Sequence, residues 1–462
     1  AFAVSMSLYL LGLVYLKTKK LKYQISNIKY LSRYSLFFIL ILTIGTPYTP
    51  SFTQILNSKY RTNSLISSTQ SPISDLGGTD SGEIRKIVWR GSIDIWKRYP
   101  IFGSGVETFA YSYYLDRPVE HNLVSEWDFL YNKAHNEFLN FLATTGVVGL
   151  LSYLLIILGF LVSSIQYLIS KKNRQSSYLI LGFISGYIAL AISNFFGFST
   201  VAVSLLFFLY PAFFIVLTKK ELPASKLANS PDIKQIIFIV ITLLTTSYLL
   251  MSVFTKWLAD YQFAKAKNYI SEGYLSEGIE LLNTAITLSP NEAVFYNQLS
   301  VASGKMAINL AQNSEPQEKL VSQFTEQALL ASNITLSLNP VHNNFYKTRS
   351  RLFITLSQLN PEFLLEAKSI VKQAILLAPT DAELYYYLSN IELALGETDR
   401  GINSLEKSIE LKANYGSARL ALAEQYELLE KFEKAKEQYQ YILEKINPED
   451  RVIREKLEQL EK

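Results

Sequence analysis

One histidine stands where its chemistry could matter. His135 is followed by Asn136, then by nine residues, and then by the sequence Gly-Val-Val-Gly at 146–149. This arrangement places an ionisable histidine and a polar asparagine immediately before a long apolar stretch. An imidazole with an ordinary pKa of about 6.5 can accept a proton from a hydroxyl group at neutral pH. A lone histidine on a helix is more often a structural residue with satisfied hydrogen bonds. The residues around His135 therefore have to decide between a structural and a catalytic role.

A second group of candidates lies upstream, in the segment 84–99. Its apolar residues recur with helical spacing, which predicts an amphipathic helix against the membrane surface with Ser81 as its cap. Arg85 and Trp89 share a face of that helix, and Arg90 lies about 100° further round. A guanidinium can bind phosphate oxygens bidentately, beside an indole ring that can stack on a sugar. The alternative is that the arginines reach lipid headgroups while Trp89 anchors the helix.

The helix is expected to end at a turn rich in proline and glycine. Pro100 cannot continue the helix, and Gly103 and Gly105 permit a tight return of the chain. The rival interpretation is a loop that cradles phosphate. A single Gly-x-Gly without a strand before it and a helix after it is weak support for that role, so the turn is interpreted as structural.

Together these residues resemble the signature of the O-antigen ligase / O-antigen polymerase family of membrane glycosyltransferases. The family pattern is Arg-x3-Trp, then Pro-x2-Gly-x-Gly, then His-[Asn/Ser/Gln]-x9-Gly-x2-Gly. This chain matches every position of that pattern, with Arg85, Trp89, Pro100, Gly103, Gly105, His135, Asn136, Gly146 and Gly149. The resemblance covers about residues 81–217, and it specifies the family better than the substrate.

The resemblance implies transfer of a glycan from a polyprenyl diphosphate carrier to an acceptor hydroxyl. His135 would take the proton of that hydroxyl, and Arg85 would neutralise the departing diphosphate. The transfer would be inverting, with no metal, no cofactor and no nucleotide sugar, and the chain has no Asp-x-Asp motif. The other site residues implied are the donor-binding pair Arg90 and Trp89 and the supporting pair Asn136 and Glu137.

A second histidine competes with His135 inside the same loop. His121 is also followed by asparagine, but Asn132 and Lys133 occupy the tenth and eleventh positions after Asn122, and no apolar helix follows. His121 therefore fails the rest of the pattern. Its charged neighbours leave open a site for an acceptor sugar or a cation; they are Asp116, Arg117, Glu120, Glu126 and Asp128.

Composition predicts a membrane protein of all-α class. Nearly half of the 462 residues are hydrophobic, the formal charge of +4 gives no bias toward nucleic acid, and there is no cysteine to form a disulfide or act as a nucleophile. Six apolar stretches are long enough, or nearly so, to span a bilayer: 1–16, 34–50, 147–169, 177–196, 199–218 and 235–254. The polar link at 194–200 is either a tight turn or a re-entrant bend. The chain opens inside an apolar run at Ala1, which suggests a fragment that lacks its N-terminal part. The resemblance implies that this missing part carries further arginines of the donor site.

Lysine-rich loops predict the orientation of these spans. The loops at 17–33, 171–174 and 219–234 carry most of the basic residues of the first half and are expected to be cytoplasmic. The segment 51–146 and the part after residue 255 would then lie outside the cytoplasm, where the family meets its lipid-linked glycans. The Ser/Thr-rich stretch 58–83 is expected to be mobile.

The last third of the chain has an internal repeat. The segments 285–300, 334–350, 374–390 and 408–424 align, and Pro379 and Ala413 hold equivalent positions thirty-four residues apart. This period resembles the tetratricopeptide repeat, with Gly396 and Ala418 as small residues at helix crossings and an insert at 312–323. Such helix pairs leave a groove for a peptide or protein partner. Tyr385, Tyr386 and Tyr387 would line that groove or serve as ordinary packing residues.

These observations predict a polytopic transmembrane helix bundle followed by an α-solenoid of tetratricopeptide-type pairs. Its expected parts are 1–50, truncated spans; 51–146, the outer loop; 147–256, further spans; and 257–462, the repeats. The favoured function is a bacterial inner-membrane ligase of cell-envelope polysaccharide or lipopolysaccharide synthesis, acting on undecaprenyl diphosphate-linked glycan with a glycan, lipid or protein acceptor. Alternatives are a repeat-unit polymerase, a protein O-oligosaccharyltransferase, and a non-catalytic membrane anchor that displays the repeats for envelope assembly. Transport is a weaker alternative, because few ionisable groups lie within the spans.

Overall fold

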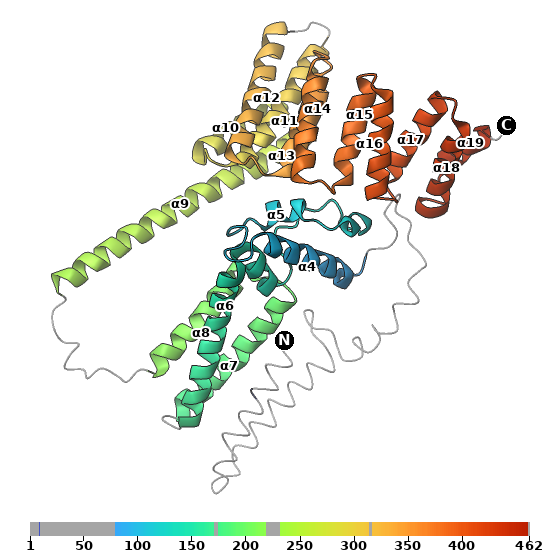
Figure 1. Cartoon of the computed structure of the whole chain (residues 1–462). Coiled ribbons are helices and arrows are strands. Elements are labelled where there is room, and N and C mark those ends of the chain that lie inside the picture. The colour runs from blue at the N-terminus through green and yellow to red at the C-terminus, as the bar shows by residue number, and fades with distance from the viewer. Residues whose placement is uncertain (1–8, 10–78, 171–173, 219–231, 314–316, 461–462) are drawn as a thin grey trace. The chain divides into compact units, whose positions relative to one another are not determined.

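The structure is a computed structural model that describes residue 9 and residues 79–170, 174–218, 232–313 and 317–460. All regular elements in these ranges are helices, with no strand among them (Figure 1). The expected all-α class is therefore confirmed. The spans expected at 1–16 and 34–50, and most of the Ser/Thr-rich stretch, lie outside the described residues.

The described residues form two compact units. The first contains the C-terminal part of α6 (Glu137–Ser170), α7 (Arg174–Phe195) and α8 (Val201–Thr218). Aromatic rings pack between these helices: the ring centroid of Tyr187 lies 4.6 Å from that of Phe160 and 5.0 Å from that of Phe207. A short non-helical link at 196–200 joins α7 to α8. The polar segment there is therefore a non-helical link of residues 196–200 between two helices.

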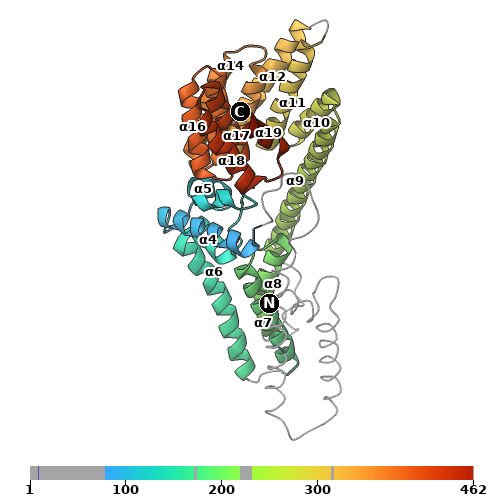
Figure 2. The same ribbon diagram turned by 90° about the vertical axis from the view of Figure 1, so that its right-hand side faces the viewer.

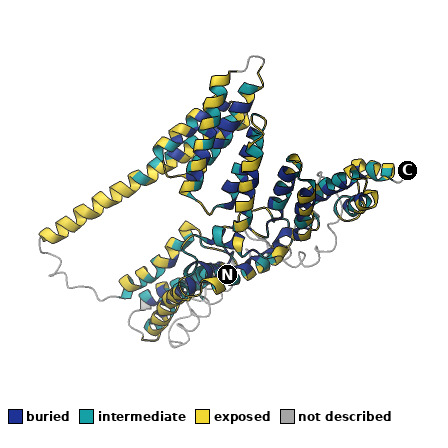
Figure 3. Cartoon of the chain, turned by 45° about the horizontal axis from the view of Figure 1, so that its top comes forward, coloured by how far each residue is buried: buried dark blue, intermediate teal, exposed yellow. Residues whose placement is uncertain are grey.

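Four helices are long and apolar enough to cross a membrane: Glu137–Ser170, Ser176–Phe195, Val201–Thr218 and Ile233–Ser271. They contain the last four of the six expected spans. The fourth is α9, in which every residue of 232–251 is exposed in the chain (Figure 3). A helix that is apolar all round and uncovered by protein matches the hydrocarbon of a bilayer. The same helix continues without a break into the repeat domain, where Ala259 and Ala266 are buried.

The second unit begins with the loop that follows the undescribed N-terminal part. It contains α4 (Ser81–Arg98), α5 (Phe109–Leu115) and the short 3-10 helix η3 (Val119–Leu123). The apolar stripe of α4 faces a small core of this loop, formed by Ile84, Val88, Ile95, Phe109, Tyr113, Val124, Tyr131, Ala134 and Ala143. The stripe expected to face the membrane surface thus packs against protein. The expected cap is also wrong: Asp80 caps α4 by accepting a hydrogen bond from the Gly82 amide, and Ser81 is already helical.

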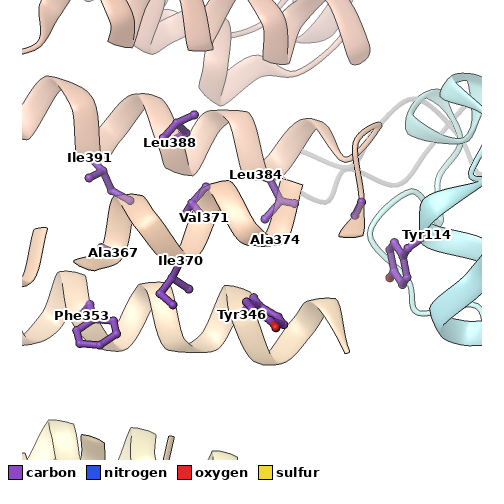
Figure 4. Close-up of a cluster of buried hydrophobic side chains, with 11 residues drawn as sticks. Tyr114, Tyr346, Phe353, Ala367, Ile370, Val371, Ala374, Leu384, Leu388 and Ile391 are labelled. Carbon is purple, nitrogen blue, oxygen red and sulfur yellow. The ribbon is translucent and has the colours of Figure 1, made fainter. Parts of the chain in front are cut away.

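The repeats occupy the C-terminal part of this unit. After α9 they continue as α10 (Leu275–Leu288), α11 (Ala293–Ala311), α12 (Glu318–Leu338), α13 (Asn343–Leu356), α14 (Phe363–Leu377), α15 (Ala382–Ala394), α16 (Thr398–Leu411), α17 (Gly416–Leu428), α18 (Phe432–Tyr441), η5 (Ile442–Ile446) and α19 (Arg451–Leu460). Antiparallel neighbours pair along this series, as Figures 1 and 2 show. The paired helices share cores such as the cluster of α13, α14 and α15 in Figure 4, which contains Phe353, Val371 and Ile391.

Two details of the repeats differ from the sequence-based view. Gly396 does not lie at a helix crossing but in the turn between α15 and α16, with a φ of 76° and open space where a Cβ would be. Gly401 has the crossing role instead, because a Cβ there would lie 2.6 Å from Leu393 Cγ. Of the three tyrosines, Tyr386 packs on the Tyr415 ring at 5.4 Å. Tyr385 donates to the Pro379 carbonyl, and Tyr387 to Glu383. These internal contacts favour packing over a groove lining.

Candidate functional site

His135 occupies a strained backbone position immediately before α6. Its φ of 53° lies in the left-handed region, which costs a residue with a side chain on the order of 1–3 kcal/mol. Asn136 caps the helix: its Oδ1 accepts from the Leu139 amide at 3.1 Å, and its carbonyl accepts from the Asn140 amide at 2.8 Å. The helix therefore begins at Glu137, directly after this cap. The cap turns the chain so that the imidazole stands outside the first turn.

The imidazole of His135 is half-buried among aromatic rings. Its centroid lies 5.4 Å from that of Tyr131 and 5.2 Å from that of Phe198, on the link between α7 and α8. Burial lowers the pKa of His135 below its usual value, and the positive charge of Arg85 lowers it further, while Glu126 opposes both. The imidazole is therefore neutral at pH 7, the state in which it can accept a proton.

Arg85 comes from the first turns of α4. Its positive charge lowers the pKa of both His135 and Tyr131, whose rings pack against each other at 5.4 Å. No hydrogen bond or ion pair of Arg85 occurs within the described residues. A cation left without a counter-ion beside a neutral histidine can bind an anionic group of a substrate, and phosphate is the anion whose geometry a guanidinium matches best.

The two candidate donor-binding residues lie in different surroundings. Trp89, one turn after Arg85, meets Phe195 edge-on at 5.8 Å. Its indole Nε1 is buried and has no hydrogen-bond partner among the described residues. Arg90 points elsewhere and donates to Glu120 Oε1 at 2.7 Å, in a pair whose side chains are both more than half exposed. Helical spacing thus groups Trp89 with Arg85 and separates Arg90 from them.

Glu126 and Tyr131 also lie in this site, although the sequence alone did not assign them to it. The Tyr131 hydroxyl donates to the Glu126 carboxylate, and both side chains lie near His135. Burial and the bond to Glu126 raise the pKa of Tyr131. In the sequence, Glu126 appeared only as a charged neighbour of His121, and Tyr131 only as part of an aromatic run. The five-residue spacing between them belongs to no regular element, so no periodic signal could have joined them.

The Pro-Gly turn and the break at Gly146 form one structural unit. Gly146 interrupts α6 with a φ of 66°, and a Cβ there would lie 2.2 Å from the Ile101 carbonyl oxygen. A Cβ at Gly103 would lie 2.2 Å from the backbone of Thr144. Across this contact Gly105 donates its amide to the Thr144 carbonyl at 2.9 Å, and the Val147 amide donates to the Pro100 carbonyl at 3.0 Å. The glycines allow two backbones to touch, as the structural interpretation predicted.

The phosphate-cradle alternative fails on the same hydrogen bonds. The amides of Gly103, Ser104 and Gly105 all donate to backbone carbonyls of the chain itself. A phosphate cradle needs free amides that converge on the ligand. This turn therefore positions the N-terminal part of α6, and with it His135.

His121 is a residue of the loop core. It is 0% exposed, and its Nδ1 lies 2.9 Å from the Tyr113 hydroxyl. Burial and the nearby Arg117 lower its pKa to about 4. Its charged neighbours separate to different partners: Asp116 pairs with Arg98 at 2.6 Å, Glu120 with Arg90 and Glu126 with Tyr131. No metal-binding group of three such residues occurs in the described ranges, so a cation site around His121 has no support there.

The first third of the chain is similar to a known family. Residues 1–154 match a family model described as O-Antigen ligase. The resemblance found in the sequence is thereby confirmed, and the match contains the whole motif series from Arg85 to Gly149. No curated protein matches the sequence.

Solved structures similar to the chain include several repeat proteins. TTC0263, a thermophilic TPR protein of Thermus thermophilus, is 20% identical, covers 44% of this chain and 98% of its own, and has a TM-score of 0.32. MamA 41-end from Desulfovibrio magneticus RS-1 is 16% identical over 42% of this chain and 97% of its own, with a TM-score of 0.33. YrrB, a TPR protein with an unusual peptide-binding site, is 17% identical over 43% and 90%, with a TM-score of 0.30.

Proposed function

We propose that this chain transfers a glycan from a polyprenyl diphosphate carrier to an acceptor hydroxyl on the extracytoplasmic face of the bacterial cytoplasmic membrane. The observation that carries the proposal is the pairing of a neutral His135 with Arg85, a cation that lacks a counter-ion among the described residues. The O-antigen ligase domain at 1–154 supports the same class of membrane glycan ligase or polymerase.

In the proposed reaction, the His135 imidazole takes the proton of the acceptor hydroxyl. The resulting oxygen attacks the anomeric carbon of the lipid-linked sugar and forms the new glycosidic bond. The bond from that carbon to the diphosphate oxygen breaks, and the electron pair leaves with the polyprenyl diphosphate. A single displacement of this kind inverts the configuration at the anomeric carbon. Arg85 offsets the negative charge that grows on the leaving oxygen.

Trp89 and Arg90 are the proposed donor-binding residues. The unpartnered indole Nε1 of Trp89 supports its role, because a buried donor gains most from a ligand that accepts its proton. Arg90 would first have to leave Glu120, so its contribution should be smaller than that of Arg85. Asn136 acts through the helix cap that orients His135. Glu137 opens α6, where a negative charge complements the helix N-terminus.

The extracytoplasmic placement rests on the loop charges together with one structural constraint. The loop that contains His135 and the repeats that follow α9 contact each other in one compact unit. Both must therefore lie on the same side of the membrane. In the sequence, one expected span separates the basic segment 171–174 from the loop of His135, and one separates 219–234 from the repeats. The positive-inside rule favours a cytoplasmic side for these basic segments and so supports the extracytoplasmic placement of the loop and the repeats. The repeats would then recruit an acceptor or assembly partner outside the cytoplasm.

The test is glycan transfer in membranes that contain the full chain and its lipid-linked donor pool. His135→Ala and Arg85→Ala should each abolish the polymer or conjugate, with lipid-linked glycan accumulating. Lys97→Ala is a matched control, since Lys97 is an exposed cation of the same helix whose ion-pair partner is Asp94.

The identity of the product separates the remaining alternatives. Conjugation of whole chains to a lipid or glycan acceptor indicates a ligase, growth of the lipid-linked chain indicates a polymerase, and modification of a protein hydroxyl indicates a protein transferase. Unchanged glycans in the His135→Ala variant, with loss of envelope function on deletion of 257–462, would contradict the enzyme and favour the membrane-anchored scaffold.

A further inference from the structure

Three alternate turns of the repeat domain, those between α12 and α13, α14 and α15, and α16 and α17, hold the loop that leads to His135. The first turn, between α12 and α13, reaches Tyr111: Asn339 Nδ2 donates to its hydroxyl at 3.0 Å, and the His342 ring meets its ring at 5.6 Å. Tyr114, one turn further along α5, enters the core of α13, α14 and α15 (Figure 4). The repeats therefore bind this loop through side chains and an apolar contact.

The second turn, between α14 and α15, binds the middle of the loop. The Thr380 carbonyl accepts from Asn122 Nδ2 at 2.7 Å and from Arg117 Nη2 at 3.2 Å. In return, Thr380 Oγ1 donates to the Arg117 carbonyl at 3.0 Å. Arg117 also donates to the Trp127 carbonyl at 3.0 Å. Arg117 and Asn122 are both buried, so these bonds are shielded from water.

The third turn, between α16 and α17, binds the segment nearest the site. Lys412 is only 2% exposed, and its Nζ donates to the Asn122 carbonyl at 2.8 Å. The same ammonium lies 4.5 Å from the centroid of the Trp127 ring, which also meets the Tyr415 ring at 5.4 Å. Taking an ammonium out of water is costly, so such a group holds tightly to the acceptors that it has. Lys412 therefore fixes both Asn122 and Trp127.

The segment fixed in this way is the one that carries the neighbours of His135. Glu126 immediately precedes Trp127, and its carboxylate binds the Tyr131 hydroxyl. Tyr131 in turn packs against the His135 ring at 5.4 Å. A chain of contacts thus runs from the turn after α16 to the imidazole, within one compact unit.

We propose that Lys412 is a positioning residue for the transfer site, which makes the repeat domain part of the scaffold of that site and not only a recruiter of partners. This inference rests on the proposed function. Lys412 touches no reacting atom; it acts through Asn122 and Trp127 on Glu126 and Tyr131, which define one wall beside His135. Small displacements of such supports can reduce turnover by as much as about a hundred-fold, because the reacting groups must be aligned closely.

The experiment measures transfer by the full chain in nanodiscs, with a lipid-linked glycan donor and its acceptor at varied concentrations. Lys412→Met keeps the length of the side chain but removes the ammonium, and it should lower kcat on the order of ten-fold or more with little change in the KM for the donor. Lys412→Arg restores a cationic donor and should recover part of that kcat. Lys407→Met is the matched control, because Lys407 lies on the same helix with 41% of its side chain exposed, in a surface pair with Glu410. It should leave kcat unchanged.

A milder variant keeps the test decisive if Lys412→Met fails to fold. Thr380→Val removes one bond to the loop and should lower kcat a few-fold, again without a matching rise in KM. The proposal is overturned if the folded Lys412→Met and Thr380→Val proteins both retain kcat within two-fold, or if Lys407→Met loses as much as Lys412→Met. Failure of the proposed function gives a different result. The His135→Ala protein would then transfer glycan at the wild-type rate, whatever the effect of the Lys412 variants.

Discussion

Acidification should open the loop around His121 well before it unfolds the rest of the chain. His121 is fully buried, and its folded pKa of about 4 lies below the ordinary value of 6.5. Between these two values the unfolded loop binds more protons than the folded one, so the stability of the folded loop decreases as the pH falls. The contribution is fully present above about pH 6.5 and is lost as the pH falls toward 4.

The magnitude follows from the two pKa values. The full difference corresponds to about 3 kcal/mol, at 1.36 kcal/mol for each pH unit. By pH 5, about 2 kcal/mol of it is lost, which makes opening of the loop about thirty-fold more frequent. Asp116 works in the opposite direction, because burial raises its pKa. A comparison of two proteins that both retain Asp116 removes this effect.

Hydrogen–deuterium exchange of the full chain in nanodiscs measures the opening of this loop separately from the rest of the chain. A local measurement is needed because a protein with several domains has no single free energy of unfolding. Peptides from 109–131 are compared at pH 7 and pH 5, after correction for the intrinsic pH dependence of exchange. Wild type should lose about 2 kcal/mol of protection there. His121→Gln should start lower, because its packing differs, but should change much less between the two pH values. Peptides from α17 and α18, which contain no histidine, are the internal reference.

Two outcomes would refute this reasoning. Equal protection of 109–131 at both pH values in wild type would mean that the histidine is not held neutral by burial. An equal loss of protection in His121→Gln would assign the pH sensitivity to other groups of the loop.

Three further predictions follow from the site and the repeats. The rate of carbethoxylation of His135, followed by mass spectrometry, should depend on pH with a midpoint below 6.5. Arg85→Gln should move this midpoint upward, since the positive charge of Arg85 lowers the pKa of His135. An unchanged midpoint would contradict an electrostatic effect of Arg85 on His135. Gly146→Ala should destabilise the kinked part of α6 by more than about 1 kcal/mol, because its φ is positive and a Cβ would meet a backbone carbonyl, whereas Gly159→Ala, with open space around it, should not; exchange of α6 amides measures both. Lys347→Met should lower the free energy of unfolding of the repeat domain by roughly 3–5 kcal/mol, because it leaves the carboxylates of Asp381 and Glu383 without their shared cation. Thermal unfolding measures this change, and a loss below about 1 kcal/mol would contradict the importance of the ion pairs.

The features that the sequence determined by itself are those with a local cause. Apolar runs of sufficient length predict spans, and each of the four that fall on described residues coincides with a long apolar helix, although the helices at Glu137–Ser170 and Ile233–Ser271 extend well beyond the expected spans. Gly103 was correctly interpreted as structural, because a positive φ is a property of one residue and its neighbours. The repeat period appeared in the sequence because each helix pair meets the same demands as the next one. The motif from Arg85 to Gly149 indicated a resemblance to the O-antigen ligase family without reference to any contact, and a family model of that description matches residues 1–154.

The tertiary structure alone decided which of these local features meet. Arg90 lies on the expected helix, yet its ion pair with Glu120 spans thirty residues and removes it from the face of Arg85. The stripe of α4 is apolar as expected, but its partner is the loop core and not a membrane surface. Glu126 and Tyr131 come to His135 through an irregular segment.

The contacts between the loop and the repeats show the reason most clearly. Asn122 binds Thr380 and Lys412, which follow it by 258 and 290 residues. Hydrophobic periodicity records whether a residue is buried and on which face of its helix, but it contains nothing about which distant surface covers it. Only the packing of the repeats against the loop brings these turns to the segment beside His135.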